Sequence, residues 1–222
     1  MGREDRNAAD LWFYERRALA EGHRIVAGVD EAGRGPLAGP VVAAAVILPL
    51  NCNVEGVNDS KQLSPRQREV AFDKIQNLAL SIGIGIVDED EIDRINILQA
   101  TYRAMRAAVN GLAVRADVFL VDGYPIRDFE RPQIGIVDGD CKSVSIAAAS
   151  IVAKITRDRI MCKYDDLFPQ YGFARHKGYT THEHLEKLAA HGICEIHRRS
   201  FGPVAQLNLL WPQEDRRKTD EL

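Results

Sequence analysis

Four acidic residues in this sequence occupy positions from which their carboxylates could share one site. Asp30 and Glu31 end one apolar run, Asp122 ends another, and Asp140 precedes an alanine-rich segment. Taken singly, each fits an ordinary acid at a strand end or helix start, where the helix dipole favours negative charge. A carboxylate directly after a buried strand is nevertheless costly unless a cation compensates its charge. The set together therefore indicates a cation site.

The residue types favour a hard divalent metal ion. Carboxylate oxygens without His or Cys partners suit Mg²⁺ or Mn²⁺ better than zinc. Two such ions about 4 Å apart serve in-line phosphodiester hydrolysis, one activating water and one stabilising the leaving oxygen. Consecutive strand residues point to opposite faces, so Asp30 and Glu31 serve one site only if the strand ends or twists there.

A glycine-rich segment, GRGPLAG at 33–39, follows the first two acids. It imitates a dinucleotide-binding fingerprint, but a strand follows it where that fingerprint requires a helix, so we reject this interpretation. The segment is better explained as a loop that brings backbone groups against a ligand, while Arg34 meets a phosphate or braces the loop.

Apolar and β-branched runs predict strands at 25–30, 40–48, 80–87, 118–122 and 134–138. Gly83 and Gly85 give the third of these one smooth face. The early strands are too close in sequence for helical crossovers, whereas helices separate the later ones. We therefore expect a mixed sheet, antiparallel at first and parallel later.

Helix signals lie between these strands. Spacing and capping predict helices at 8–20, at about 65–78, from the pair Asp88 and Glu91 to Gly111, at 145–164, from Thr180 to Gly192, and after Pro203. The alanine-rich part of the 145–164 helix allows close packing. Residues 213–222 are polar and are predicted to be a frayed tail.

The composition excludes several classes of protein. The chain has 222 residues, 45% hydrophobic and 27% charged, with a net charge of −3, which is typical of a globular protein with a real core. The longest apolar run is too short to span a bilayer and the N-terminus lacks a secretory signal, so we expect a cytoplasmic protein that does not bind membranes. The four cysteines form no Cys-x-x-Cys pair.

Several segments together resemble the ribonuclease HII family. They are VDEAGRGPLAGPV at 29–41, DSK at 59–61, SIAAASIVAK at 145–154 and HKGYT at 176–180, in family order over roughly residues 11–204. The resemblance implies an α/β, ribonuclease H-like mixed central sheet flanked by helices. It also implies a catalytic domain at 1–164 and a C-terminal helical appendage at 165–212 that completes the substrate site.

The same resemblance implies an endoribonuclease that acts in replication and ribonucleotide excision repair. Its substrates would be RNA–DNA hybrids and DNA duplexes with embedded ribonucleotides, cut 5′ of the ribonucleotide to leave 3′-hydroxyl and 5′-phosphate ends. By motif, Asp30, Glu31, Asp122 and Asp140 match the family's catalytic acids, which bind Mg²⁺ or Mn²⁺. Nothing suggests an obligate protein partner, so we expect a monomer.

Substrate-binding residues also carry over from the resemblance. The backbone of Gly33, Arg34 and Gly35 would read the ribose 2′-hydroxyl, which distinguishes RNA from DNA. Tyr179 would pack on the sugar at the RNA-to-DNA junction, although a tyrosine at the edge of the core is the simpler explanation without the resemblance. Lys61 would contact a phosphate, although a solvated lysine is the default in a polar loop.

Other charged residues have less specific interpretations. The basic runs at 175–177 and 197–199 are either solvated faces or patches near the nucleic acid, whereas Arg157 suits local pairing and packing within its helix. Asp138 stands where the family often has a basic residue, and Tyr124-Pro125 where it often has Asn. The extra acid either strengthens metal binding or weakens the approach of nucleic acid.

Two rival functions remain from the sequence. One is a nuclease or strand-transfer enzyme of the same fold that cuts DNA. The other is a non-catalytic module that binds hybrids. The intact acids argue against the second, because a pure binder gains nothing from negative charge gathered against phosphates.

Overall fold

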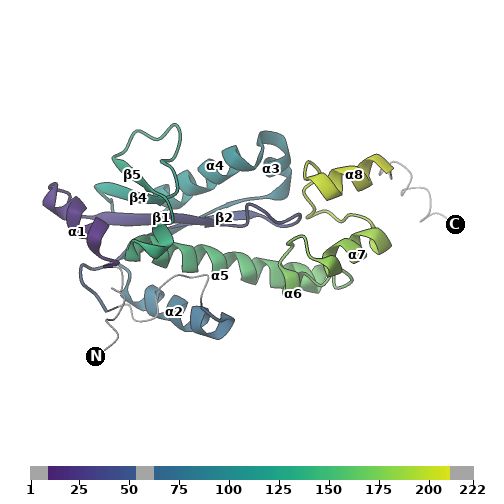
Figure 1. Ribbon diagram of the computed structural model, residues 1–222, viewed down its shortest axis with the longest axis horizontal. Helices are drawn as coiled ribbons and strands as arrows, with labels where there is room; N and C mark the ends of the chain where they lie inside the picture. The colour runs from purple at the N-terminus through teal and green to yellow at the C-terminus, as the bar shows by residue number, and fades with distance from the viewer. Residues whose placement is uncertain (1–9, 54–62, 211–222) are drawn as a thin grey trace, which may run out of the picture. The chain divides into compact units, whose positions relative to one another are not determined.

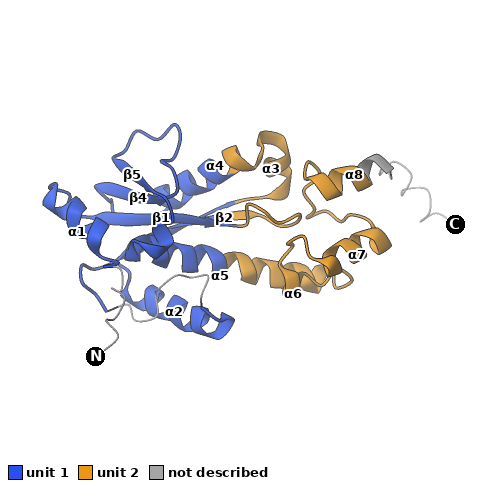
Figure 2. Ribbon diagram, viewed as in Figure 1, with its two compact units in different colours: residues 1–32, 42–86, 101–155 blue, residues 33–41, 87–100, 156–222 orange. Residues whose placement is uncertain are grey.

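The computed structural model describes residues 10–53 and 63–210, with side chains up to 207. It divides into two compact units (Figure 2). Unit 1 comprises residues 1–32, 42–86 and 101–155, and unit 2 comprises residues 33–41, 87–100 and 156–222. Lys61 and the polar tail predicted at 213–222 lie outside the described residues.

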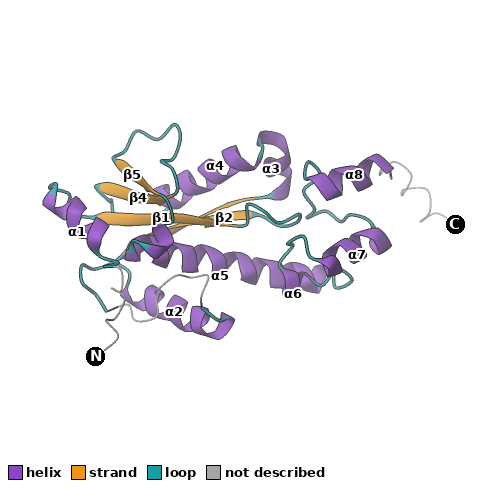
Figure 3. Ribbon diagram, viewed as in Figure 1, coloured by secondary structure: helices purple, strands orange, loops and turns teal. Residues whose placement is uncertain are grey.

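Unit 1 is built on a five-stranded sheet in the order β3-β2-β1-β4-β5. Figure 3 draws its strands in orange. The strands are β1 (Val26–Ala32), β2 (Val41–Ile47), β3 (Ser81–Val87), β4 (Val118–Asp122) and β5 (Gln133–Ile136). β1 pairs antiparallel with β2 and parallel with β4, and β4 pairs parallel with β5. The mixed sheet expected from the sequence is confirmed.

Helices cover both faces of this sheet (Figure 1). On one face lies α4 (Ile97–Asn110), which approaches β3 where the strand has glycines: a Cβ on Gly83 would stand 1.9 Å from the Ala108 carbonyl oxygen. On the other face are α2 (Pro65–Leu78) and α5 (Val144–Leu167). A Cβ on Gly28 would stand 2.0 Å from the Ser145 carbonyl carbon, so β1 and the start of α5 touch backbone to backbone. The close packing predicted for the alanine-rich helix is confirmed.

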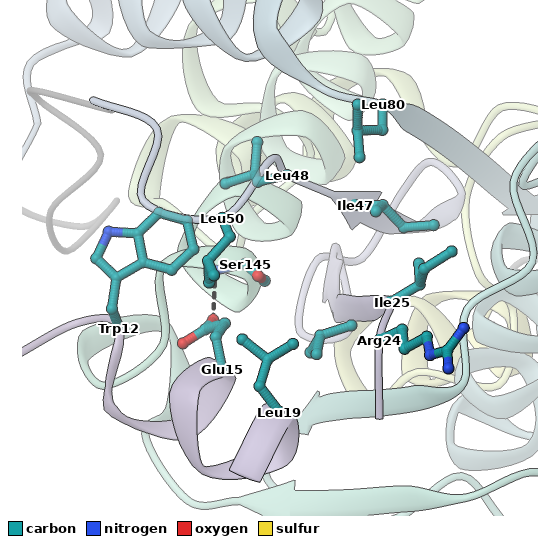
Figure 4. Close-up of a pocket in the computed structure, with 11 residues that line it drawn as sticks. Trp12, Glu15, Leu19, Arg24, Ile25, Ile47, Leu48, Leu50, Leu80 and Ser145 are labelled. Atoms are coloured by element: carbon teal, nitrogen blue, oxygen red, sulfur yellow. Dashed lines mark hydrogen bonds between the residues drawn. The ribbon is translucent and has the colours of Figure 1, made fainter. Parts of the chain in front are cut away.

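The start of α5 is capped by its preceding residue, Ser143, whose hydroxyl accepts a 3.3 Å hydrogen bond from the Ile146 amide, and also from α1 (Phe13–Ala20). Glu15 is buried, and its Oε1 accepts hydrogen bonds from the Ser143 hydroxyl at 2.6 Å and the Ser145 amide at 3.0 Å. A carboxylate at a helix N-terminus satisfies amides that have no partner within the helix. Glu15 also lines a mostly apolar pocket of unit 1 (Figure 4), which none of the four candidate acids lines.

Unit 2 consists mainly of helices and loops. Its helices are α3 (Glu89–Ile95), α6 (Phe173–His176), α7 (His182–His191) and α8 (Gly202–Leu210), with the second half of α5. Ala38, Met161, Tyr171, Phe173 and Ile196 form one apolar cluster of this unit, and Leu37, Leu188, Ile193 and Val204 form another. The loop at 33–40 therefore contributes Leu37 and Ala38 to the core of unit 2.

Three helix predictions were wrong in detail, one of them because the helix predicted at 8–20 begins only at Phe13. The helix expected from Asp88 to Gly111 is broken at Asn96, which has φ 68° and accepts hydrogen bonds on its side-chain oxygen from the amides of Leu98 and Gln99. Asn tolerates a positive φ better than most residues, and with ψ 161° Asn96 leaves the helical conformation, so α3 ends there and α4 begins after it. The cap of α7 is Thr181, one residue after the predicted Thr180.

In the described part of the chain, no helix combines the length and the apolar character needed to cross a bilayer. The cytoplasmic location and the monomeric state stay predictions. So does the domain boundary near residue 164.

Candidate active site

Two of the candidate acids come from adjacent parallel strands of unit 1. Val29 of β1 stands opposite Val121 of β4, and Asp30 and Asp122 are the next residues in each strand. Side chains alternate along a strand, and the even-numbered residues of these strands, such as Val26 and Leu120, share a core cluster with Ile146 of α5. Asp30 and Asp122 therefore leave the sheet side by side, on the face that α5 covers.

Asp30 is a buried acid, with 5% of its surface exposed. Its Oδ1 accepts a 2.7 Å hydrogen bond from the Glu31 amide, and the Ser150 hydroxyl of α5 also bonds to the carboxyl. The pKa of Asp30 is raised well above its ordinary value, first by burial and then by the negative charges of Glu31 and Asp122. The same two neighbours would make a bound cation favourable.

Asp140 is brought towards Asp122 by a short 3₁₀ helix, η1 (Gly139–Cys141). The Gly139 amide donates a 2.7 Å hydrogen bond to Oδ1 of Asp122, and Asp140, the next residue, is 1% exposed. A Cβ on Gly139 would stand 3.2 Å from the same Asp122 oxygen, so glycine permits this approach. Asp138, the extra acid, is exposed and begins η1 in the left-handed region, with φ 53°.

Glu31 follows Asp30 directly in β1. β1 continues to Ala32, so the strand does not end between the two acids, yet the charge of Glu31 acts on the Asp30 carboxyl more strongly than that of Asp122 does. Among the described residues, no three His, Cys, Asp or Glu side chains already stand as a set of metal ligands. The donor chemistry does fit a hard divalent ion, because buried carboxylates that repel one another gain most from a cation bound by oxygen.

The glycine loop belongs to unit 2, and its glycines differ in what they permit. Gly33 has φ 97°, and a Cβ there would stand 2.1 Å from Nε of Arg157; Gly39 has φ 84° and faces the Met161 sulfur. The structure itself therefore requires glycine at both positions. Gly35 has neither constraint, since a Cβ there would meet nothing within 4 Å. Because Gly35 has no side chain, its backbone is open on the side where a Cβ would lie.

Tyr179 also belongs to unit 2 and is 41% exposed, which fits both a tyrosine at the edge of the core and a ring that contacts a ligand. Its amide donates to the His176 carbonyl, and its carbonyl is 2.9 Å from Nδ1 of His184. His184 in turn contacts His197, with 3.1 Å between their Nε2 atoms. Burial lowers the pKa of His184 to about 4 and that of His197 to about 3, so these rings are neutral at pH 7.

The basic run at 197–199 is not a solvated face, which was one of its two interpretations; that it lies near the nucleic acid stays a prediction. His197 and Arg198 are buried, and Arg199 alone of the three is exposed. The buried guanidinium of Arg198 donates hydrogen bonds to backbone carbonyls of the glycine loop, which compensate for its loss of water. A run of letters cannot distinguish such a residue from a solvated one.

Sequence reasoning missed Ser150 and the distant partners of Arg157, although a signal for both exists. Ser150 and Arg157 are seven residues apart in α5, in the same helical stripe as Ile146, Ala153 and Met161. All members of that stripe are buried. A polar residue in an apolar stripe needs a buried partner, and the structure gives Ser150 the carboxyl of Asp30 and Arg157 three backbone carbonyls.

Comparison with known proteins identifies the family. The model of the family described as Ribonuclease HII matches residues 27–204. A ribonuclease HII of Acetivibrio thermocellus is 56% identical over 192 residues, which is 86% of this chain and 75% of the relative. One of Geobacter metallireducens is 54% identical over 203 residues, covering 91% of this chain and 95% of the relative.

A solved structure agrees with these relatives. The crystal structure of the ribonuclease H2 from Pyrococcus horikoshii OT3 matches with a TM-score of 0.72 and 30% identity, covering 84% of this chain and 98% of that one. The ribonuclease H-like fold expected from the sequence is therefore confirmed. The chain belongs to the ribonuclease HII family and is a ribonuclease H-type enzyme.

Proposed function

We propose that this protein cuts the RNA strand of RNA–DNA hybrids and cuts DNA duplexes 5′ of single embedded ribonucleotides, leaving 3′-hydroxyl and 5′-phosphate ends. Endoribonuclease activity on hybrids is the activity of the family. The observation that carries the proposal is the pair Asp30 and Asp122, side by side in adjacent strands, with Asp30 buried and repelled by its acidic neighbours.

In this proposal Asp30, Glu31, Asp122 and Asp140 hold divalent ions, Mg²⁺ or Mn²⁺. Such ions, when bound, supply an activated water and neutralise charge on the leaving oxygen. The chain itself orients the ligands: Ser150 and the Glu31 amide fix the carboxyl of Asp30, and the Gly139 amide fixes that of Asp122. A site held this way from several elements is positioned before its ligand arrives.

Recognition of the ribose is assigned to the loop at Gly33, Arg34 and Gly35. Gly35 supports this assignment, since nothing within the protein requires glycine there while a ligand close to the backbone would. The half-exposed ring of Tyr179 supports a contact with the sugar at the junction. For Lys61 we propose the phosphate contact that its motif implies.

The direct test is incubation with a DNA duplex that carries one ribonucleotide, in Mg²⁺ and separately in Mn²⁺, with the product ends mapped. We expect a single cut 5′ of the ribonucleotide, with 3′-hydroxyl and 5′-phosphate ends. The control is the same duplex made entirely of DNA, which should stay intact.

Two results would replace the proposal. Digestion of the all-DNA duplex at the rate of the ribonucleotide duplex would indicate a DNA nuclease of the same fold. Tight binding of the hybrid without cutting, in every divalent ion tried, would indicate a binding module.

A further inference from the structure

Unit 2 contains two arginines that are 0% exposed, Arg157 and Arg198. Among the described residues, neither guanidinium forms an ion pair with a carboxylate; both donate their hydrogen bonds to backbone carbonyl oxygens. Burying a guanidinium is expensive, and these two also repel each other. Because burying both guanidinium groups is costly, we ask what their hydrogen bonds to the backbone hold in place.

Arg198 holds the glycine loop itself. Its Nη2 donates to the Gly33 carbonyl at 2.6 Å, its Nη1 to the Arg34 carbonyl at 3.0 Å, and its Nε to the Gly39 carbonyl at 2.9 Å. One planar guanidinium thus connects both ends of the loop. Its own amide donates to the Leu37 carbonyl at 2.8 Å, which ties down the middle.

Arg157 holds the far end of the loop and the segment before Tyr179. It donates to the carbonyls of Pro40 at 2.9 Å, Ala38 at 3.0 Å and Lys177 at 3.0 Å. Its guanidinium carbon lies 5.7 Å from the centre of the Tyr179 ring, within cation–π range. The loop and the tyrosine therefore share one support.

These contacts decide which way the loop amides point. In a planar trans peptide, the carbonyl of one residue and the N–H of the next point in opposite directions. Arg198 draws the carbonyls of Gly33 and Arg34 towards itself, so the N–H groups of Arg34 and Gly35 are turned away from it. Those are backbone donors of the segment that we propose to read the ribose.

We propose that Arg198, with Arg157, is a positioning residue for ribose recognition: it fixes the carbonyls of the glycine loop so that the amides of Arg34 and Gly35 face the substrate's 2′-hydroxyl. This inference rests on the proposed function. A lysine at 198 keeps the charge but loses the rigid fork that reaches several carbonyls at once, so Arg198→Lys tests the geometry rather than the charge.

The experiment compares the affinities of the full-length protein for two duplexes that differ only by one ribonucleotide. They are measured in Ca²⁺ buffer, over times in which neither duplex is cut. For Arg198→Lys we expect the preference for the ribonucleotide duplex to fall roughly 10- to 100-fold, while affinity for the all-DNA duplex changes less than about twofold.

The matched control is Arg131→Lys in unit 1. Arg131 also donates to a backbone carbonyl, that of Ala116, and its guanidinium lies over the ring of Phe119. The control should keep the full preference.

The outcomes separate the two claims. If the wild type itself shows no preference, the proposed function fails and the positioning role fails with it. If the wild type shows a preference and folded Arg198→Lys keeps it, the positioning role alone is refuted. An equal loss of affinity for both duplexes would also refute it, because that is what a merely structural residue would produce. If Arg198→Lys does not fold, Arg157→Lys is tested instead, by the ratio of its affinities for the ribonucleotide duplex and the all-DNA duplex.

Discussion

The two units of this protein handle buried charge in opposite ways. In unit 1, Asp30 is buried beside Glu31 and Asp122, and like charges raise its pKa. In unit 2, Arg157 and Arg198 are buried among carbonyl oxygens that accept their hydrogen bonds. The first arrangement leaves a repulsion among carboxylates that a bound cation would relieve, whereas the second is complete within the chain. In the proposed function, unit 1 therefore carries the reaction, and the glycine loop and Tyr179 of unit 2 recognise the substrate.

The largest expected effect comes from neutralising the acids of unit 1. We expect Asp30→Asn to lower the rate of cutting by about 1,000-fold or more, because the site loses a metal ligand. The unfolding temperature in EDTA should stay the same or rise, since the substitution removes a buried negative charge from a repulsive pair. The control, Asp128→Asn, changes an exposed acid of the same unit and should leave both quantities unchanged. Near-normal turnover of Asp30→Asn would show that the metal assignment is wrong.

The packing behind the acids is tested by Gly28→Ala. The added Cβ would stand 2.0 Å from the Ser145 backbone, so β1 and α5 must separate. We expect a loss of about 3 kcal/mol or more in the free energy of unfolding, measured by chemical denaturation. Gly202→Ala is the comparison, because a Cβ there meets nothing within 4 Å. Equal stability of the two variants would contradict the close approach of strand and helix.

The buried charges of unit 2 give a pH signature through Glu89. Burial raises its pKa to about 7, against the lowering effect of Arg198. Between the ordinary pKa near 4.5 and this value, the folded state keeps a proton that the unfolded chain has lost, so stability falls as pH rises. Relative to Glu89→Gln, we expect the wild type to lose about 2–3 kcal/mol between pH 4.5 and 7.5.

The measurement is the denaturation midpoint across that pH range. Glu195→Gln, at an exposed acid of the same unit, should follow the wild-type curve. Parallel curves for the wild type and Glu89→Gln would mean that Glu89 is ionised at the same pH whether the chain is folded or unfolded.

A smaller effect should separate substrate contact from stability at Gly35. Its replacement by Ala meets no atom of the protein within 4 Å, so the unfolding temperature should stay within about a degree. If the nucleic acid lies against this loop, the methyl group enters that contact, and kcat/KM on the ribonucleotide duplex should fall about tenfold. Unchanged kinetics would place the substrate elsewhere.

The sequence predicted best what is decided locally. The helix predicted at about 65–78, the strand periods and the glycines of β3 each depend on neighbours a few residues away or on one packed helix, and all are confirmed. In the structure, Ser64 and Gln67 form the capping box that starts this helix. The break at Asn96 was missed because the apolar period continues through it. A single residue with a positive φ divides the helix without changing that period.

The candidate site was predicted only in part, because local patterns are visible in the sequence and contacts between distant residues are not. Asp30 and Asp122 were identifiable because an acid directly after a buried run is visible in the sequence, and the parallel register of β1 and β4 places them together. The role of Arg198 was not identifiable, since the Gly39 carbonyl that it binds is 159 positions earlier in the chain. Only the fold brings such partners together.

The central claim is that the carboxylates of unit 1 bind divalent ions, and manganese anomalous diffraction tests it most directly. A crystal of the wild-type protein soaked in Mn²⁺ should show anomalous peaks beside the carboxylates of Asp30 and Asp122, and a crystal of Asp30→Asn should show weaker peaks or none. Absence of any peak beside these residues in the wild type, with lysine or arginine side chains neutralising them instead, would contradict the account.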